Sequence, residues 1–196
     1  RKKFGIPEDD IVLLSVGRLT PAKRPHTMIE VFSHLEEKLG DVTLCIAGKG
    51  ELFEETKALV EKKGLRKVLF LGHVGYDQNL PDLYACSDYY IMTSKYEGGM
   101  PPLTLAEAMA SGLPCIVSDI PNLRIVNEAN CGVTIDFGDV EAAVQNIVGY
   151  FNGRNENHAY RARKFAENVL DWEPIATKYL NEFAKMNCVD HVDGYQ

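Results

Sequence analysis

The sequence has 196 residues, of which 45% are hydrophobic and 25% charged, and its formal net charge at pH 7 is −7. This composition predicts one soluble globular domain, or one domain with a helical appendage. The acidic balance argues against a nucleic-acid-binding surface. No apolar run is long enough to span a bilayer, so we expect membrane association only through segments absent from this chain. The five cysteines lack paired metal-type spacing, which favours a reducing, cytoplasmic setting.

The first predicted strand, at 11–16, is a continuous apolar run that follows an expected linker at 1–10. Further strands are predicted at 42–47, 68–71, 89–93, 115–118 and 132–135. The intervening segments are predicted to be helical at 25–39, 51–63, 79–87, 121–128, 140–150 and 157–169, with an alanine-rich helix ending before Gly112. Apolar strands that alternate with helices predict an α/β fold: a Rossmann-like, doubly wound parallel sheet of about six strands, with helices on both faces, over residues 11–170.

The segment 171–186 is predicted to be an amphipathic helix. Trp172, Ile175, Tyr179 and Phe183 fall three or four residues apart, on one stripe. The stripe could pack on its own domain, which we favour for Trp172, or it could face an N-terminal domain that this chain lacks. Residues 187–196 are predicted to be a frayed tail. Because the sequence begins without Met, we expect a piece of a longer protein.

The segment from Ser94 to Pro114 carries the strongest functional signal. Gly98 and Gly99 lie in its loop and allow backbone N–H groups to approach a ligand closely. The following helix has a positive N-terminal end, which suits a phosphate group. Glu107 lies about one turn into that helix, where it can accept hydrogen bonds from ligand hydroxyls. The pattern predicts a nucleotide or sugar-nucleotide site, and the alternative is that Gly-Gly-Met-Pro-Pro forms only a tight turn.

In a parallel sheet, ligands bind at the carboxyl ends of the strands. Arg18 and Lys23 follow the first strand, where two cations could neutralise a diphosphate; otherwise they are solvated surface charges. We expect His73 to be structural, and Val74 to offer its backbone to a base. Gly48 and Gly50 either line the same pocket or form a strand-to-helix turn. The sequence contains no cluster with metal-ligand spacing, so no metal site is predicted.

These residues together resemble the carboxyl-terminal domain of the family four retaining glycosyltransferases, which have the GT-B fold. The resemblance covers about residues 10–185 and rests on Gly17-Arg18-Leu19 with Lys23, Ala47-Gly48-x-Gly50, Phe70-Leu71-Gly72-x-Val74, and Glu97-Gly98 leading to Glu107-Ala108-Met109-Ala110-x-Gly112-x-Pro114.

The resemblance implies a nucleotide-diphosphate sugar donor, UDP-, GDP- or ADP-linked, with no obligatory metal or other cofactor. The catalytic residues that it implies are Arg18, Lys23 and Glu97. The donor-binding residues that it implies are Gly17, Gly48, Val74, Gly98, Gly99, Met100, Leu103, Thr104 and Glu107. The family usually has seven residues between its two glutamates, whereas this chain has nine, so the loop must bulge or Glu97 must shift.

The implied reaction is glycosyl transfer with retention of anomeric configuration. The acceptor would bind an N-terminal domain outside this chain, so we expect the chain alone to bind donor with little or no transfer. The alternatives are a sugar-nucleotide epimerase and a non-catalytic module that binds sugar nucleotides. A flavodoxin-like or receiver domain would need acidic residues at the mouth of the sheet, where this chain has basic loops.

Overall fold

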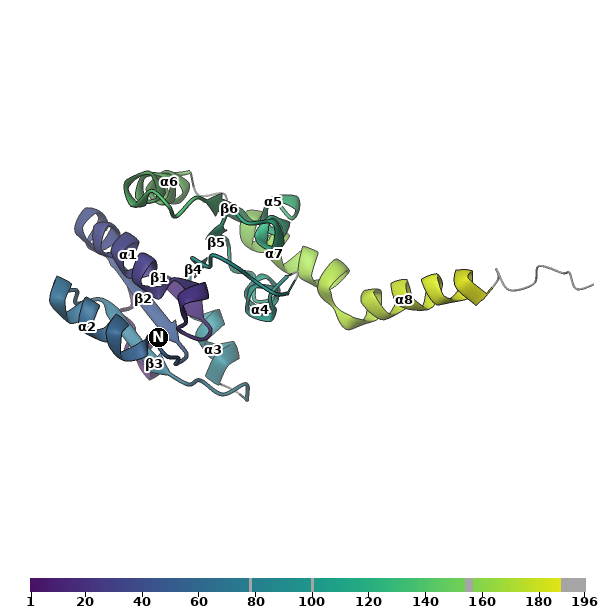
Figure 1. Ribbon diagram of the computed structural model, residues 1–196, viewed down its shortest axis with the longest axis horizontal. Helices are drawn as coiled ribbons and strands as arrows, with labels where there is room; N and C mark the ends of the chain where they lie inside the picture. The colour runs from purple at the N-terminus through teal and green to yellow at the C-terminus, as the bar shows by residue number, and fades with distance from the viewer. Residues whose placement is uncertain (78, 100, 154–156, 188–196) are drawn as a thin grey trace, which may run out of the picture.

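The computed structural model describes residues 1–77, 79–99, 101–153 and 157–187 (Figure 1). Its six strands pair in parallel in the order β3-β2-β1-β4-β5-β6. This is the order of doubly wound, Rossmann-like sheets, so the predicted fold is confirmed. The strands are β1 (Ile11–Val16), β2 (Val42–Ala47), β3 (Val68–Gly72), β4 (Tyr89–Met92), β5 (Cys115–Ser118) and β6 (Gly132–Ile135).

Helices cover both faces of the sheet and form two hydrophobic cores (Figure 1). On β1, Leu13 packs into one core while Val12 and Leu14 pack into the other, because successive side chains of a strand point to opposite faces. Burial on both sides explains why the strands are apolar throughout. One face carries α1 (Pro25–Leu39), α2 (Phe53–Lys63) and α6 (Val140–Asn152), and the other carries α3 (Asn79–Ala85), α4 (Leu103–Ala110), α5 (Ile125–Glu128) and α7 (Asn157–Phe165).

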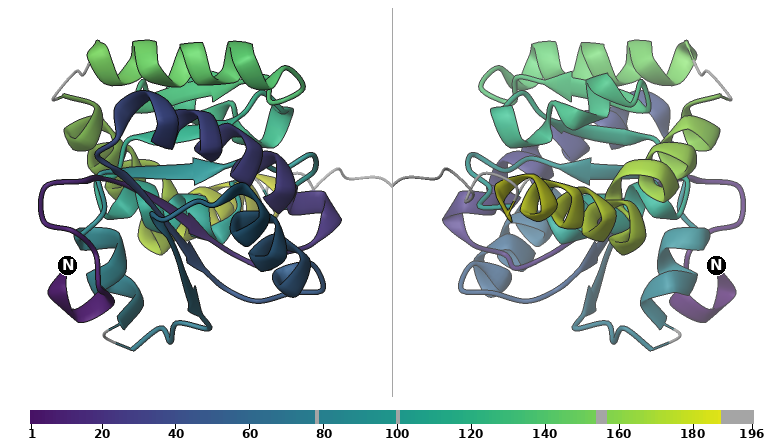
Figure 2. Two further views of the ribbon diagram at one scale, coloured as in Figure 1. Left: turned by 90° about the vertical axis from the view of Figure 1, so that its left-hand side faces the viewer. Right: turned by 90° about the vertical axis from the view of Figure 1, so that its right-hand side faces the viewer.

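The first ten residues, expected to be a linker, pack onto the domain. A 3₁₀ turn, η1 (Lys2–Phe4), lies beside α3 in both views of Figure 2, and Lys3 Nζ is 2.8 Å from Asp82 Oδ2 on that helix. Ile6 is buried in the core. The Arg1 guanidinium donates to the Asp88 carboxylate at 2.8 Å. Contacts with residues 79 and 87 positions away hold this stretch in place.

Several element boundaries differ from the predicted ones by a few residues. α2 begins at Phe53 rather than at residue 51, and α3 ends at Ala85 rather than at residue 87. The single helix predicted at 157–169 is α7 followed by a π-helical segment, η4 (Ala166–Leu170). The Asp139 carboxylate caps α6, since it accepts from the backbone N–H of Ala142 at 3.0 Å.

The last helix, α8 (Trp172–Asn187), extends away from the body of the domain (Figure 1). Packing of Trp172 on its own domain, the favoured expectation, is wrong, because this side chain is 79% exposed. Tyr179, Leu180 and Phe183 are also exposed. Residues 188–196, predicted to be a tail, lie outside the described residues. None of the described helices combines the length and apolarity needed to cross a bilayer.

A buried carboxylate ties the amino ends of three strands together. Asp10 accepts from the Thr43 hydroxyl at 2.6 Å and from Lys67 Nζ at 3.0 Å. Burial raises the pKa of Asp10, but the hydrogen bonds from Thr43 and Lys67 outweigh it, so the pKa lies below its usual value. Asp10 is therefore ionised in the folded protein and stabilises the sheet at neutral pH.

We predict that Asp10→Asn lowers the free energy of unfolding by about 1–3 kcal/mol at pH 7, as expected for loss of charge-assisted hydrogen bonds. Because the folded-state pKa is depressed, this stabilisation is present above the unfolded-state pKa and is lost as pH falls through the folded-state pKa. Urea unfolding from pH 7 to pH 3 should show the wild type and the variant converging. Asp9→Asn, at the neighbouring exposed position, is the matched control; an equal loss in both variants would contradict the assignment.

Candidate functional site

The strand order reverses between β1 and β4, so the chain leaves these neighbouring strands toward opposite faces of the sheet. α1 follows β1 on one face, and α4 follows β4 on the other. In doubly wound sheets this switch point, at the carboxyl ends of the strands, is where ligands bind. Two predicted site residues meet there, since Lys23 Nζ contacts Glu97 Oε1 at 2.5 Å. The Glu97 side chain is only 6% exposed, so its charge is paired rather than solvated.

The loop that carries Lys23 is fastened to the segment after β4. Thr93 Oγ1 lies 3.0 Å from the carbonyl oxygen of Lys23 and 3.2 Å from that of Arg24. The backbone N–H of Lys95 donates to the carbonyl of Ala22 at 2.8 Å. Arg24 adopts a left-handed conformation, with φ of 52°, just before α1 begins. Sequence reasoning missed Thr93 and Arg24; a threonine at the carboxyl end of the strand predicted at 89–93 was the available signal.

Arg18 and Lys23 line one small cavity of about 20 Å³, together with Gly17, Tyr90 and Ser94. This volume is close to that of a single water molecule, so a diphosphate could bind only at the open rim. Arg18 is exposed at that rim. The Ser94 hydroxyl is buried and has no hydrogen-bond partner among the residues that the structure describes. Arg18 thus presents its charge to solvent, while the charge of Lys23 is balanced by Glu97.

The N-terminus of α4 lies in the same region. Leu103 and Thr104 are its first two residues, and their N–H groups have no acceptor one turn earlier within the helix. Pro102, at the N-cap position, has no N–H group and no side-chain hydrogen bond. Leu103 is 72% exposed, so this positive helix end is accessible.

The glycine loop before α4 is held by a residue that sequence reasoning missed. Asn122 Nδ2 donates to the carbonyl of Glu97 at 2.7 Å and to that of Gly99 at 3.2 Å. Gly98 and Gly99 are exposed. The predicted site residue Met100 lies outside the described residues.

Glu107 is joined to the rest of the site through two buried phenols. Tyr84 donates to Glu107 Oε2 at 2.8 Å, and its oxygen lies 3.2 Å from the carbonyl of Thr104. Tyr90 donates to Thr104 Oγ1 at 2.9 Å. Burial raises the pKa of both tyrosines well above the usual value, so both phenols stay protonated near neutral pH. Glu107 also lines an open cavity of about 500 Å³, together with Leu103, Trp172 and Ile175.

The other predicted residues lie along the loops after β1, β2 and β3. The backbone N–H of Gly48 donates to the carbonyl of Gly72 at 2.6 Å. A Cβ atom on Gly48 would lie 1.9 Å from the Gly17 carbonyl oxygen, and one on Gly50 would lie 2.3 Å from that of Leu19. Gly48 and Gly50 are therefore required for packing between loops, whether or not a ligand binds.

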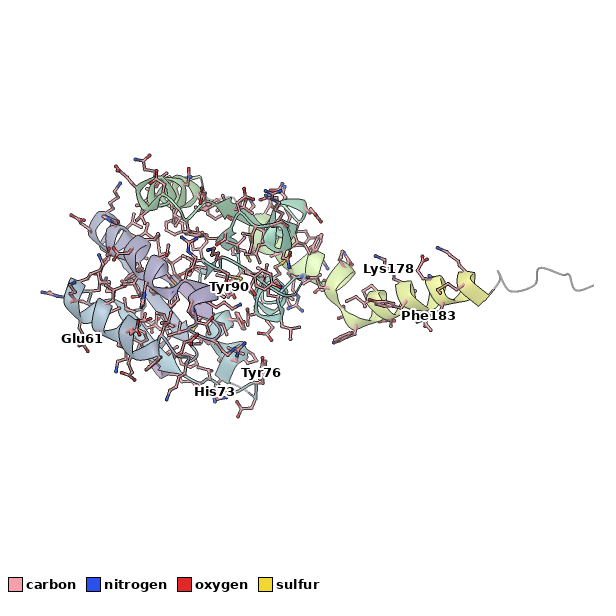
Figure 3. The ribbon with its side chains drawn as sticks, in the orientation of Figure 1. Glu61, His73, Tyr76, Tyr90, Lys178 and Phe183 are labelled. Atoms are coloured by element: carbon pink, nitrogen blue, oxygen red, sulfur yellow. The ribbon has the colours of Figure 1, made fainter. Side chains whose placement is uncertain are left out.

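His73 and Val74 follow β3. His73 is exposed, whereas Val74 is half-buried against the core that contains α3. Figure 3 labels His73 and Tyr76 at the edge of the domain near α3, and Tyr90 in its interior. Within the described residues, no group of three or more His, Cys, Asp and Glu side chains is placed to hold a metal ion.

Comparisons with known proteins indicate the family to which this chain is similar. A family model described as "Glycosyl transferases group 1" matches residues 1–168. The chain is 32% identical over 152 residues to the Escherichia coli enzyme UDP-Gal:alpha-D-GlcNAc-diphosphoundecaprenol alpha-1,3-galactosyltransferase, a match that covers 75% of this chain and 38% of that protein.

WaaG and TarM are among the solved structures that are similar in fold. WaaG, a glycosyltransferase involved in lipopolysaccharide biosynthesis, matches with a TM-score of 0.74 and 26% identity, over 85% of this chain and 45% of WaaG. A mutant of S. aureus TarM, in complex with fondaparinux, alpha-GlcNAc-glycerol and UDP, matches with a TM-score of 0.72 and 25% identity, over 88% of this chain and 35% of TarM. The chain thus spans less than half the length of each of these proteins.

We predict that alanine destabilises the protein where a glycine packs between loops and is tolerated where a glycine is exposed. Gly48→Ala should lower the free energy of unfolding by about 2–5 kcal/mol, because it combines a backbone φ of 139° with a clash against Gly17. Gly98→Ala should change it by less than about 0.5 kcal/mol, because Gly98 has open space around it and no left-handed backbone. Urea unfolding followed by circular dichroism measures both, and equal stabilities would contradict the packing role of Gly48.

Proposed function

The chain belongs to the group 1 glycosyl transferases and has a GT-B-type, Rossmann-like domain, and we propose that it is the carboxyl-terminal, donor-binding domain of a retaining glycosyltransferase of family four. The donor would be a nucleotide-diphosphate sugar. The observation that carries the proposal is the meeting of Lys23 and Glu97 at the switch point, beside the exposed N-terminus of α4. A cation, a carboxylate and free helix amides lie together where this class of sheet binds nucleotides.

The diphosphate would be held at the rim by Arg18, Lys23 and the first N–H groups of α4, those of Leu103 and Thr104. Arg18 is exposed and could bind an anion directly, whereas Lys23 would have to exchange its contact with Glu97 for one with phosphate. As the glycosyl–phosphate bond loosens, negative charge grows on the leaving diphosphate, and these preorganised groups would stabilise it. Because protein groups supply the positive charge, donor binding should need no metal.

The sugar would lie against Glu97, Gly98, Gly99 and Met100. The contacts of Asn122 with the carbonyls of Glu97 and Gly99 support a loop that accommodates its two extra residues by bulging, while Glu97 stays at the switch point. The contact of Glu97 with Lys23 argues against the alternative, in which Glu97 is shifted.

The nucleoside would extend across the loops after β1, β2 and β3. Glu107 would accept from the ribose hydroxyls, and Val74 would meet the base through its backbone. Gly17 and Gly48 would pass beneath the donor. The similar E. coli galactosyltransferase is named for a UDP-linked donor, and the similar TarM structure contains UDP, which makes UDP the first ligand to test.

The acceptor site would belong to a further domain, because the chain spans less than half the length of the galactosyltransferase and of WaaG. The exposed side chains of α8, Tyr179, Leu180 and Phe183, would face that domain. A cytoplasmic setting is part of the proposal, and the buried free thiols of Cys45 and Cys115 are compatible with it.

We predict that a nucleoside diphosphate raises the thermal unfolding midpoint of the chain. At a ligand concentration about 100-fold above Kd, the stabilisation is about 2.7 kcal/mol, equivalent to several degrees for a domain of this size. UDP, GDP, ADP and their sugars form the panel, each with and without EDTA, which should leave the rise unchanged. Arg18→Ala and Glu107→Ala should each abolish most of the rise.

The controls for these two variants are Arg66→Ala and Glu61→Ala, which remove the same charges from exposed positions before β3 and on α2. Both should keep the full rise. If Arg18→Ala and Glu107→Ala also keep it, the donor is not bound at this rim.

We further predict that the chain alone binds the donor but transfers sugar slowly or not at all, since the acceptor site lies elsewhere. Incubation with a radiolabelled nucleotide sugar and a panel of acceptors measures transfer, and nuclear magnetic resonance of the nucleotide sugar alone would reveal epimerisation. Rapid transfer by the isolated chain would contradict the two-domain arrangement, and epimerisation would favour the alternative reaction.

A further inference from the structure

Two buried tyrosines connect the elements that surround the proposed donor site. Tyr84 lies on α3 and is 2% exposed, and Tyr90 lies on β4 and is fully buried. Their ring centroids are 6.4 Å apart. Figure 3 places Tyr90 in the interior of the domain, and Tyr90 also lines the small cavity that Arg18 and Lys23 line. Both phenols contact residues of α4, so they tie α3 and β4 to that helix.

Each phenol has one proton to donate, which limits what each can bind. Tyr90 donates its one hydrogen bond to the hydroxyl of Thr104. Tyr84 has two acceptors within reach, the Glu107 carboxylate at 2.8 Å and the Thr104 carbonyl at 3.2 Å. The carboxylate is the shorter contact and the stronger acceptor, so the proton of Tyr84 is directed at Glu107.

We propose that Tyr84 is a positioning residue, which fixes the carboxylate of Glu107 so that its remaining acceptor capacity faces the ribose of the donor. This inference rests on the proposed function and extends it to Tyr84, a residue that would act through Glu107 and would not touch the donor itself. A glutamate on a helix surface can rotate about three side-chain bonds, and ordering it upon binding would weaken affinity. The hydrogen bond from Tyr84 orders the carboxylate before the donor arrives.

Tyr84 is well suited to this role because it cannot move or ionise easily. It is packed in the core between α3 and α4, and its raised pKa keeps the phenol protonated. A carboxylate has about four acceptor directions, so one bond from Tyr84 leaves the others available for the two ribose hydroxyls. A purely structural tie between α3 and α4 would use the same bond, and the experiment must separate these roles.

The test compares UDP with 2′,3′-dideoxy-UDP by isothermal titration calorimetry on the full 196-residue chain. GDP and ADP, with their dideoxy analogues, are measured in parallel. The wild type should prefer the ribose form. Tyr84→Phe should weaken binding of the ribose form about three- to tenfold, the effect of one hydrogen bond, and leave binding of the dideoxy form unchanged. In a Glu107→Ala background, Tyr84→Phe should have no further effect on either ligand.

The matched control is Tyr150→Phe, which removes the hydroxyl of a half-buried tyrosine on α6 that contacts His158 Nδ1 on α7 at 2.8 Å. It should leave both affinities unchanged. If Tyr84→Phe does not fold, 4-fluorophenylalanine at position 84 fills the volume of the hydroxyl without a donor. Restoring a donor with 4-aminophenylalanine should restore the preference for ribose.

The outcomes distinguish this inference from the proposed function. A wild type that binds none of the nucleotides, or that shows no preference for ribose, contradicts the function assigned to Glu107. A wild type that prefers ribose, with Tyr84→Phe behaving in the same way, contradicts only the role of Tyr84. Equal weakening of the ribose and dideoxy forms would show that Tyr84 acts on the fold and would overturn the inference.

Discussion

The parallel pairing of β1 with β4 is the constraint on which the rest of the site depends. β1 also pairs with β2, so the order of strands reverses there, and α1 and α4 leave toward opposite faces of the sheet. The two loops must separate as they leave the sheet. Lys23 and Glu97 meet where they do so, and Thr93 and Lys95 fasten one loop to the other. Residues seventy positions apart thereby form one rim.

The charges of this rim differ from those of the whole chain. The net charge is −7, yet Arg18, Lys23 and the N-terminus of α4 bring positive charge to one place. Glu97 is buried, and a buried carboxylate is tolerated only when it is paired, so it holds Lys23 in position. Arg18 remains exposed. In the proposed donor site, Arg18 would bind the diphosphate directly, and Lys23 would exchange Glu97 for it.

The glycines around the rim serve different purposes. Gly48 and Gly50 allow the loops after β1 and β2 to touch, and side chains there would collide with backbone. Gly98 has open space around it and no such packing role. A glycine directly after β2 thus serves packing, whereas a glycine within the longer loop after β4 lies at an open surface.

The sequence by itself determined the α/β class, the six strands and the amphipathic helices, because periodicity and burial on both faces are local properties of a segment. The resemblance, carried by short motifs, identified the family. Only the tertiary structure decided that the first ten residues pack on the domain, that Trp172 is exposed, and that Thr93, Asn122 and Tyr84 support the rim. These features depend on contacts between distant residues, whose separation in space no local pattern of side chains encodes.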